Sequence, residues 1–298
     1  MNLRDLEYFI AVAELKHFRK AAEKCFVSQP ALSGQLKKLE TEIGLVLFHR
    51  TSRLVNLTPA GESLLVYAKN ILGEARLLSE VAQSFRDPRR GPLKLCVIPT
   101  LAPYLTPIVV QVTGKLHPKL ELFLSEAKTL DLVAGLMTGT FEAGFLALPV
   151  NNPKINTAEI FVEAFLLAVP VGHPLSRRRE LSISDLANQS LFVLEEGHCL
   201  KDQVLDVCNY GGAHEYPHFR GSSLETLRQM IGAGNGATLM PLLAARAPIS
   251  QAASIRYLPF CEPRPHRRLA LAWRKGSPRE KFFLAWSEEL KKSLAKID

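Results

Sequence analysis

Apolar residues recur at helical spacing through the first forty-three residues, and this pattern predicts three helices. Ser28 suits the N-cap of the third helix, Pro30 its first turn and Gly44 its end. Small residues at the crossing of the second and third helices indicate a helix-turn-helix arrangement. The inward positions are Leu3, Leu6, Phe9, Ile10 and Ala13; then Ala21, Ala22 and Cys25; and, over residues 29–43, Leu32, Leu36, Leu39 and Ile43.

Two further patterns follow these helices. Residues 48–58 alternate into a short hairpin or wing. Residues 59–86 predict one long helix, because apolar positions continue along one side of it. A lone exposed helix with such a stripe needs a partner surface. The stripe consists of Leu64, Leu65, Ala68, Ile71, Leu72, Ala75, Leu78, Val81 and Ala82.

Beyond a hinge at residues 87–92, strand and helix patterns alternate, which predicts an α/β layer arrangement with a largely parallel sheet. A second set begins near residue 164, and the C-terminal segments return to the first set. Two lobes with crossing chains would enclose a cleft between them. The strand and helix segments are residues 93–98, 103–115, 120–124, 129–140, 143–148, 164–169, 191–194, a helix from 199, 224–231, 237–240, 269–273 and 278–296.

Positive charge concentrates in the helix-turn-helix segment. Between Lys16 and Thr58, eight Lys or Arg face three Glu, a net charge of +5. Basic charge, turn chemistry and a wing together favour DNA binding over the alternative, a solvated amphipathic helix pair. Gln29 is suited to an adenine edge, and the wing arginines to phosphates. The candidate DNA-binding residues, which include outward positions of the third helix, are Ser28, Gln29, Pro30, Ser33, Gln35, Lys37, Arg50, Thr51 and Arg53.

The composition is that of an ordinary globular protein of two or three domains. The 298 residues are 47% hydrophobic and 22% charged. Five cysteines are too few, and odd in number, for a secreted disulfide framework, and no apolar run approaches the roughly 20 residues of a membrane span. The charged start differs from a signal peptide. We therefore expect a cytoplasmic protein with no membrane partner, in which a thiol pair is catalytic or sensory.

The segment from Leu3 to Gly61, which contains FRKAAEKCFVSQPALSGQLKKLETEIG, resembles the winged helix-turn-helix of LysR-type transcriptional regulators. Gly34 stands where most members carry Arg, and Gly there resembles the peroxide-sensing OxyR branch. The resemblance implies that the partners are double-stranded promoter DNA, further copies of the chain as a homodimer and a dimer-of-dimers tetramer, and RNA polymerase. It implies a DNA-binding domain over residues 1–58, a linker dimerisation helix over 59–87 and a regulatory domain over 88–298.

The stretch of residues 197–208 carries the clearest candidate chemistry. A helix that begins near Cys199 would place its thiol among free backbone N–H groups, beside His198 and Lys201, surroundings that favour a thiolate. Cys208 would then lie about 13 Å along the helix and on its opposite face. A disulfide needs Cα atoms within about 7 Å, so the two can pair only if the helix unwinds. The alternative is that Cys208 is a small buried hydrophobe.

Segments of the remaining chain, VIPTLAPYL, EAKTLDLVAGL, LEEGHCLKDQVLDVC and HFRGSSLETLRQMIGAG, also resemble the OxyR branch. The resemblance implies that hydrogen peroxide oxidises Cys199, which then forms a reversible disulfide with Cys208. It implies a peroxide pocket of Thr100, Thr129, Gly197, His198, Asp202 and Arg267. It also implies a two-lobed, periplasmic-binding-protein-like domain, with lobe I at about residues 92–162 and 268–298 and lobe II at about 163–267.

The residues by themselves leave other roles open. The Thr100 and Thr129 hydroxyls also suit helix caps, Asp202 a first-turn carboxylate and Arg267 an ordinary surface charge. The sequence contains no CxxC spacing, and we expect neither a metal nor a cofactor. A thiol peroxidase and a metabolite-responsive LysR-type regulator are the rival functions. The cysteines without a redox role, which we expect to be buried or incidental, are Cys25, Cys96 and Cys261.

Overall fold

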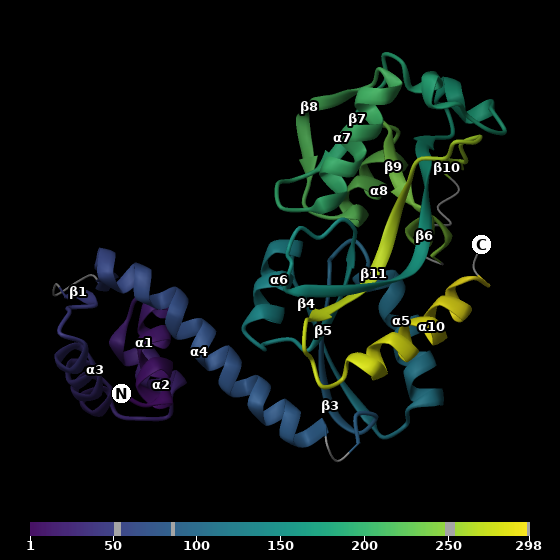
Figure 1. Ribbon diagram of the computed structural model, residues 1–298. Coiled ribbons are helices and arrows are strands. Elements are labelled where there is room, and N and C mark those ends of the chain that lie inside the picture. The colour runs from purple at the N-terminus through teal and green to yellow at the C-terminus, as the bar shows by residue number, and fades with distance from the viewer. Residues whose placement is uncertain (51–54, 85–86, 248–253, 297–298) are drawn as a thin grey trace. The chain divides into compact units, whose positions relative to one another are not determined.

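The computed structural model describes residues 1–50, 55–84, 87–247 and 254–296 (Figure 1). The chain divides into two compact units. The first consists of Met1–Gln83 with Met137–Thr140, and the second of Ser84–Leu136 with Phe141–Asp298.

The first unit contains the predicted helices and wing. Three short helices pack around Phe9, Leu32 and Leu36, and the hairpin adds Leu47 and Phe48 to this core. The Ser28 hydroxyl caps the third helix by accepting a hydrogen bond from the Ala31 amide, and Gly44 ends it in the left-handed conformation. Its elements are α1 (Leu3–Leu15), α2 (Phe18–Lys24), α3 (Gln29–Ile43), β1 (Phe48–Arg50), β2 (Val55–Leu57) and α4 (Pro59–Ser84).

The apolar stripe of α4 divides between two environments. Ala68 and Leu72 are buried in the core of the first unit, with Leu72 only 8% exposed. Ile71 and Leu78 are exposed, and Leu78 is 72% exposed. The prediction that Leu65, Ile71, Leu72 and Leu78 are exposed on one side is therefore wrong for Leu72, which packs into the core with the shorter helices.

The second unit alternates strands and helices. It contains β3 (Gly91–Val97), α5 (Ala102–Leu116), β4 (Leu120–Glu126), α6 (Thr129–Met137), β5 (Ala143–Ala147), β6 (Ile155–Pro170), η1 (Pro174–Arg177), η2 (Ile183–Leu186), β7 (Ser190–Leu194), α7 (Cys199–Gly211), β8 (His214–Gly221), α8 (Leu224–Gly232), β9 (Thr238–Pro241), α9 (Leu242–Arg246), β10 (Ile255–Leu258), β11 (His266–Arg274) and α10 (Glu280–Leu294).

The strands of this unit form one large mixed sheet and a small separate pair. The order in the large sheet is β10-β6-β11-β5-β3-β4, with β9 also beside β6. Only β3 with β4 and β3 with β5 are parallel in it, and all pairs that involve β6 or β11 are antiparallel. The prediction of a largely parallel sheet is therefore wrong, because a long return strand, β11, lies between β5 and β6.

Strand β6 belongs to both lobes of the unit (Figure 1). Its first part, up to Ala164, pairs with β11, and its last part, from Phe165, pairs with β9 and then β10. The two lobes are thus joined by continuous strands. The small pair of parallel strands, β7 and β8, lies in the second lobe beside α7.

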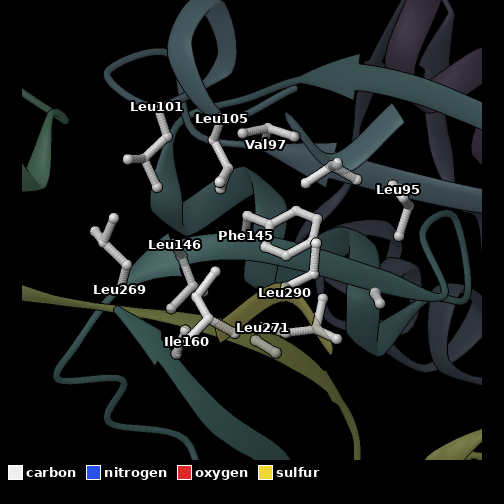
Figure 2. Packing of buried hydrophobic residues seen from close by; sticks show 14 of the residues in the cluster. Leu95, Val97, Leu101, Leu105, Phe145, Leu146, Ile160, Leu269, Leu271 and Leu290 are labelled. Carbon is white, nitrogen blue, oxygen red and sulfur yellow. The ribbon is translucent and has the colours of Figure 1, made fainter. Parts of the chain in front are cut away.

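Each lobe has its own apolar core. Figure 2 shows Phe145 of β5 among aliphatic side chains of β3, α5 and α10, namely Leu95, Val97, Leu105 and Leu290, all part of the first core. The second core joins β6, β7, α7 and α8 through residues such as Phe165, Leu194, Leu200 and Leu227. The prediction of two α/β lobes is confirmed.

Candidate thiol site and nucleic-acid interface

Helix α7 begins at Cys199, as predicted. His198 is the N-cap residue, and its side chain makes no capping hydrogen bond, although its carbonyl accepts from the Lys201 amide at 3.0 Å. Gly197 precedes it with φ of +86°, a conformation that favours glycine. A Cβ at Gly197 would also lie only 2.9 Å from Cδ of Lys128. The turn into α7 therefore depends on glycine for its backbone conformation, and a side chain there would also displace Lys128.

Cys199 lies where the second lobe meets the first. It is half-buried and packs against the first core, although most of α7 belongs to the second core. That first core contains Ile98 and Leu101, on either side of Thr100 in the chain. The thiol is thus placed at the boundary of the lobes, against the core that also contains the chain neighbours of Thr100.

Cys208 occupies the opposite environment on the same helix. It is 2% exposed and packs inside the second core. Burial, and secondly the negative charge of Glu215, raise the pKa of Cys208 to about 11, so it remains a thiol at neutral pH. It lies nine positions after Cys199 in the unbroken helix, which corresponds to about 13 Å along the axis.

The charges around Cys199 are arranged differently from the predicted cationic surroundings. Burial, and secondly the positive charge of Lys128, lower the pKa of His198, so its ring is neutral at pH 7. The buried Lys201 ammonium is paired with Glu196. The N-terminus of α7 adds positive potential at this position.

Lys128 connects the two lobes beside this turn. Its ammonium donates to the Glu196 carbonyl at 2.8 Å and to Oε1 of Glu195 at 3.2 Å. These contacts hold the β7–α7 loop against the loop that precedes α6. The sequence gives one signal for this role, which is that Lys128 directly precedes the candidate Thr129.

Thr100 and Arg267 form a buried cluster with Glu163. Nη1 of Arg267 donates to the Thr100 hydroxyl at 3.0 Å, and Nε of Arg267 donates to Oε2 of Glu163 at 2.6 Å. Arg267 and Glu163 have fully buried side chains. The interpretation of Arg267 as a surface charge is therefore wrong, and so is that of Thr100 as a helix cap, because Leu101 is the N-cap residue of α5.

Thr129 and Asp202 are placed at the starts of two helices. Thr129 is the first residue of α6, and its hydroxyl oxygen is buried with no hydrogen-bond partner among the described residues. Asp202 is exposed in the first turn of α7, where a carboxylate is favoured by the helix dipole. The threonine offers an unused donor in a buried position, and the aspartate a solvated acceptor.

The other three cysteines are unpaired. Cys96 is buried in β3, and burial raises its pKa to about 11. Cys25 and Cys261 are half-buried. Within the described residues, no three His, Cys, Asp or Glu side chains are placed to share a metal ion.

Helix α3 presents its first turn to solvent. Gln29 and Pro30 are exposed there, and Lys37 is exposed two turns later. Ser33 is half-buried. The prediction that Gln35 faces outward is wrong, because its amide donates to the buried carboxylate of Asp5 at 2.7 Å.

The wing is tied to α3 by Glu40, whose Oε1 accepts hydrogen bonds from the Leu47 and Phe48 amides. Arg50 lies at the end of β1, with its backbone opposite Val55. The predicted DNA contacts Thr51 and Arg53 lie outside the described residues.

None of the helices in the described ranges combines the length and apolar content needed to cross a membrane.

Three residues of the thiol site were missed by reasoning from the sequence, namely Lys128, Glu163 and Glu196. Glu163 has a recognisable signal, since it is the one charged residue within the apolar run FVEAFLLAVP. A charge in such a run is expected to be paired when it is buried. Its partner could not be identified, because Arg267 lies about a hundred residues away in the chain.

Known proteins resemble the chain over nearly its whole length. Residues 3–62 match the bacterial regulatory helix-turn-helix protein, lysR family, and residues 86–295 match the LysR substrate binding domain. The DNA-binding transcriptional dual regulator OxyR of Escherichia coli K12 is 45% identical over 278 residues, 93% of this chain and 91% of that protein. The structure of a full-length OxyR variant of Pseudomonas aeruginosa matches with a TM-score of 0.77 at 35% identity. The match covers 98% of this chain and 95% of that chain. The structure of a hydrogen-peroxide-bound OxyR mutant of Corynebacterium glutamicum matches with a TM-score of 0.68 at 33% identity. That match covers 99% of this chain and 93% of the other.

Proposed function

The chain belongs to the LysR family of bacterial transcriptional regulators, and from that premise we propose that it is a DNA-binding regulator that senses hydrogen peroxide. The relatives support this assignment, since they include an OxyR regulator and an OxyR structure with hydrogen peroxide bound. The observation that carries it is the half-buried Cys199 at the start of α7, against the core of the other lobe. We assign DNA binding to residues 1–58, dimerisation to 59–87 and sensing to 88–298.

In the proposed reaction, the Cys199 thiolate attacks one oxygen of hydrogen peroxide. A sulfur–oxygen bond forms as the oxygen–oxygen bond breaks, so the sulfur is oxidised to sulfenic acid and the peroxide is reduced. The departing hydroxide takes a proton and becomes water, a transfer that positioned hydroxyl donors assist. The residues that we propose to hold the peroxide are Thr100, Thr129, Gly197, His198, Asp202 and Arg267.

The second proposed step joins Cys208 to the oxidised Cys199. The Cys208 sulfur attacks the sulfenic sulfur, a disulfide forms, and water leaves. Because Cys208 is buried and about 13 Å away along α7, the helix must unwind before the sulfurs can meet. The rearranged segment would then change the contacts of the lobe and the form of the oligomer on DNA.

We infer that the regulator works as an oligomer on promoter DNA in the cytoplasm. The exposed apolar side of α4, with Ile71 and Leu78, is suited to pair with the same helix of a second copy. Two such dimers would form a tetramer that contacts RNA polymerase. The scheme uses peroxide as the signal and needs no cofactor.

A disulfide map tests the proposed function. The reduced protein is treated briefly with low-micromolar hydrogen peroxide, alkylated, digested and analysed by mass spectrometry. We expect a peptide that links Cys199 to Cys208, with Cys25, Cys96 and Cys261 still alkylated as free thiols. Promoter binding that responds to a metabolite without this link would identify a metabolite-responsive regulator, and steady peroxide turnover would identify a thiol peroxidase.

A further inference from the structure

The buried cluster of Glu163, Arg267 and Thr100 contains a carboxylate for which the proposed reaction has no role so far. Oε2 of Glu163 accepts from Nε of Arg267 at 2.6 Å, and its Oε1 accepts from the Leu243 amide at 2.8 Å. Both oxygens are thus engaged, one by β11 and the other by α9. Glu163 and Arg267 are directly opposite each other in the β6–β11 register, close to where β6 leaves β11 for β9.

We propose that Glu163 is a positioning residue for peroxide reduction, which acts through Arg267 to fix the direction in which the Thr100 hydroxyl donates its proton. This inference rests on the proposed function, because it concerns the same reaction at Cys199.

The direction of the hydroxyl follows from what its partner can do. A guanidinium has only donors, so the Thr100 oxygen must accept in its 3.0 Å contact with Nη1 of Arg267. Nη2 of Arg267 also lies 3.4 Å from the Thr100 carbonyl oxygen, which holds the fork across this residue. The hydroxyl proton is therefore directed away from Arg267. A donor polarised by a cation in a buried position stabilises a developing negative charge more strongly than a free hydroxyl in water.

Glu163 determines where this cation lies. An isolated guanidinium is costly to bury, and the carboxylate provides the opposite charge and the anchor at Nε. The Leu243 amide holds Glu163 in place, and Glu163 holds Nε of Arg267. The other two nitrogens of the guanidinium contact Thr100. Without the carboxylate, Arg267 would move toward another acceptor, and the Thr100 hydroxyl would be free to rotate.

In the reaction, the oriented Thr100 hydroxyl donates a hydrogen bond to the departing oxygen while the Cys199 sulfur bonds to the other oxygen. The hydroxyl keeps or regains its proton, and the departing hydroxide ends as water. Glu163 itself does not touch the peroxide. Its removal should therefore slow peroxide reduction without changing reactions of Cys199 that have no departing oxygen.

A matched ion pair on the same strands provides the control. Glu159 of β6 pairs with Arg268 of β11, but this pair is exposed and does not reach Thr100. Glu159→Gln thus removes the same kind of contact outside the cluster. Glu163→Gln keeps the shape of the side chain and removes the charge.

The experiment measures two rates in the full-length protein with Cys208→Ser, so that oxidation stops at sulfenic acid. One is peroxide oxidation of Cys199, followed by trapping of the sulfenic acid, and the other is iodoacetamide alkylation of Cys199. We expect Glu163→Gln to slow oxidation about 10- to 100-fold, in the range of a misplaced catalytic contact, with alkylation changed less than about twofold. Glu159→Gln should change neither rate.

Substitutions at Thr100 keep the test valid if Glu163→Gln folds poorly. Thr100→Val removes the hydroxyl and should slow oxidation about 100-fold, whereas Thr100→Ser should retain most of the rate. Adding Glu163→Gln to Thr100→Val should produce little further loss, because both act on one donor.

Three results would overturn the inference. These are equal oxidation rates for Thr100→Val and Thr100→Ser, effects of Glu163→Gln and Thr100→Val that multiply, and equal losses of oxidation and alkylation. If the parent protein forms no sulfenic acid, the proposed function itself fails and the inference fails with it. If the parent reacts and Glu163→Gln reacts equally fast, only the inference fails.

Discussion

In the first unit, the candidate DNA-contact residues Gln29, Pro30 and Lys37 are exposed on one helix, α3, and follow one another closely in the chain. In the second unit, the candidate peroxide-pocket residues come from segments far apart in the chain. Thr100 and Arg267 are 167 residues apart in sequence, and both are buried. The first set is suited to reading an external surface with little rearrangement, and the second to a reaction shielded from water.

Within the second unit, the two cysteines of α7 also differ in how accessible they are. Cys199 is half-buried at the boundary of the lobes, whereas Cys208 is enclosed in one core with a pKa of about 11. A sensor needs one thiol that peroxide can reach and a second that becomes available only after the first has reacted. The fold provides this order through burial.

The largest expected effect is the loss of the peroxide response, in the second unit, while DNA binding by the first unit is unchanged. Cys199→Ser should abolish the response to peroxide, because no other cysteine occupies a comparable position. Affinity of the reduced protein for its operator should change less than about twofold, since Cys199 and α3 belong to different compact units. Fluorescence anisotropy with and without peroxide measures both. A normal peroxide response in this variant would contradict the proposed mechanism.

The next effect concerns Cys208 in the Cys199→Ser background. With its pKa raised from 9.0 to about 11, its thiolate fraction at pH 8 is about 100-fold lower than in an unfolded chain. Alkylation of the folded protein should be slower by at least this factor, and should rise about tenfold from pH 8 to 9. Mass spectrometry in buffer and in urea gives the ratio. Equal rates would mean that Cys208 is already accessible in the reduced fold.

Helix α4 distinguishes association from folding. Leu78→Glu should weaken dimerisation by at least about 2 kcal/mol, about 30-fold, if the exposed side pairs with a second copy. Sedimentation velocity measures the change. Leu72→Glu is the comparison, since it places a charge in the core and should lower the melting temperature of the first unit instead. Unchanged sedimentation of Leu78→Glu would exclude this side of α4 as the dimer surface.

Gln29 tests direct readout by the exposed set. Gln29→Ala should cost about 1–3 kcal/mol on the cognate operator and much less on unrelated DNA, if the side chain reads a base edge. The oxidation rate of Cys199 should remain that of the parent. An equal loss on all DNA sequences would instead assign Gln29 to backbone contacts.

The smallest effect is expected at Gly34. This residue lies within α3, and a Cβ there would meet open space. Gly34→Ala should therefore stabilise the first unit by about 0.5–1 kcal/mol, because glycine loses more conformational freedom in a helix. Thermal unfolding measures the gain. A lower melting temperature would show that the backbone at this position needs glycine.

The first unit was largely predictable because its signals are local. The caps Ser28 and Gly44 and the leucine spacing of α3 specify the helix without reference to distant residues. The bond between Gln35 and Asp5 was missed because it joins two helices thirty positions apart. In the second unit, the start of α7 at Cys199 was predictable for the same reason, since Gly197 and the apolar spacing that follows it are also local signals.

The second unit was predicted in its order of elements and less well in its topology. Strand β8 was missed because its residues, HEYPHFRG, are mostly polar and include a proline. The first half of β6 was missed because its pattern is irregular before the apolar run near residue 164. The Glu163–Arg267 pair depends on the register of two strands, and a pattern within either strand does not determine that register.

The pairing of β6 with β11 also determines the order in which the parts of the protein can mature during synthesis. The helices and wing of the first unit, residues 3–84, leave the ribosome early, whereas the first part of β6 has no partner strand until residues 266–274 follow. At about 5–20 residues per second, roughly 10 to 40 seconds separate the two events. During that interval each nascent chain carries a folded helix-turn-helix and no finished sensor. Newly made protein thus acquires its regulation only with the last tenth of its sequence.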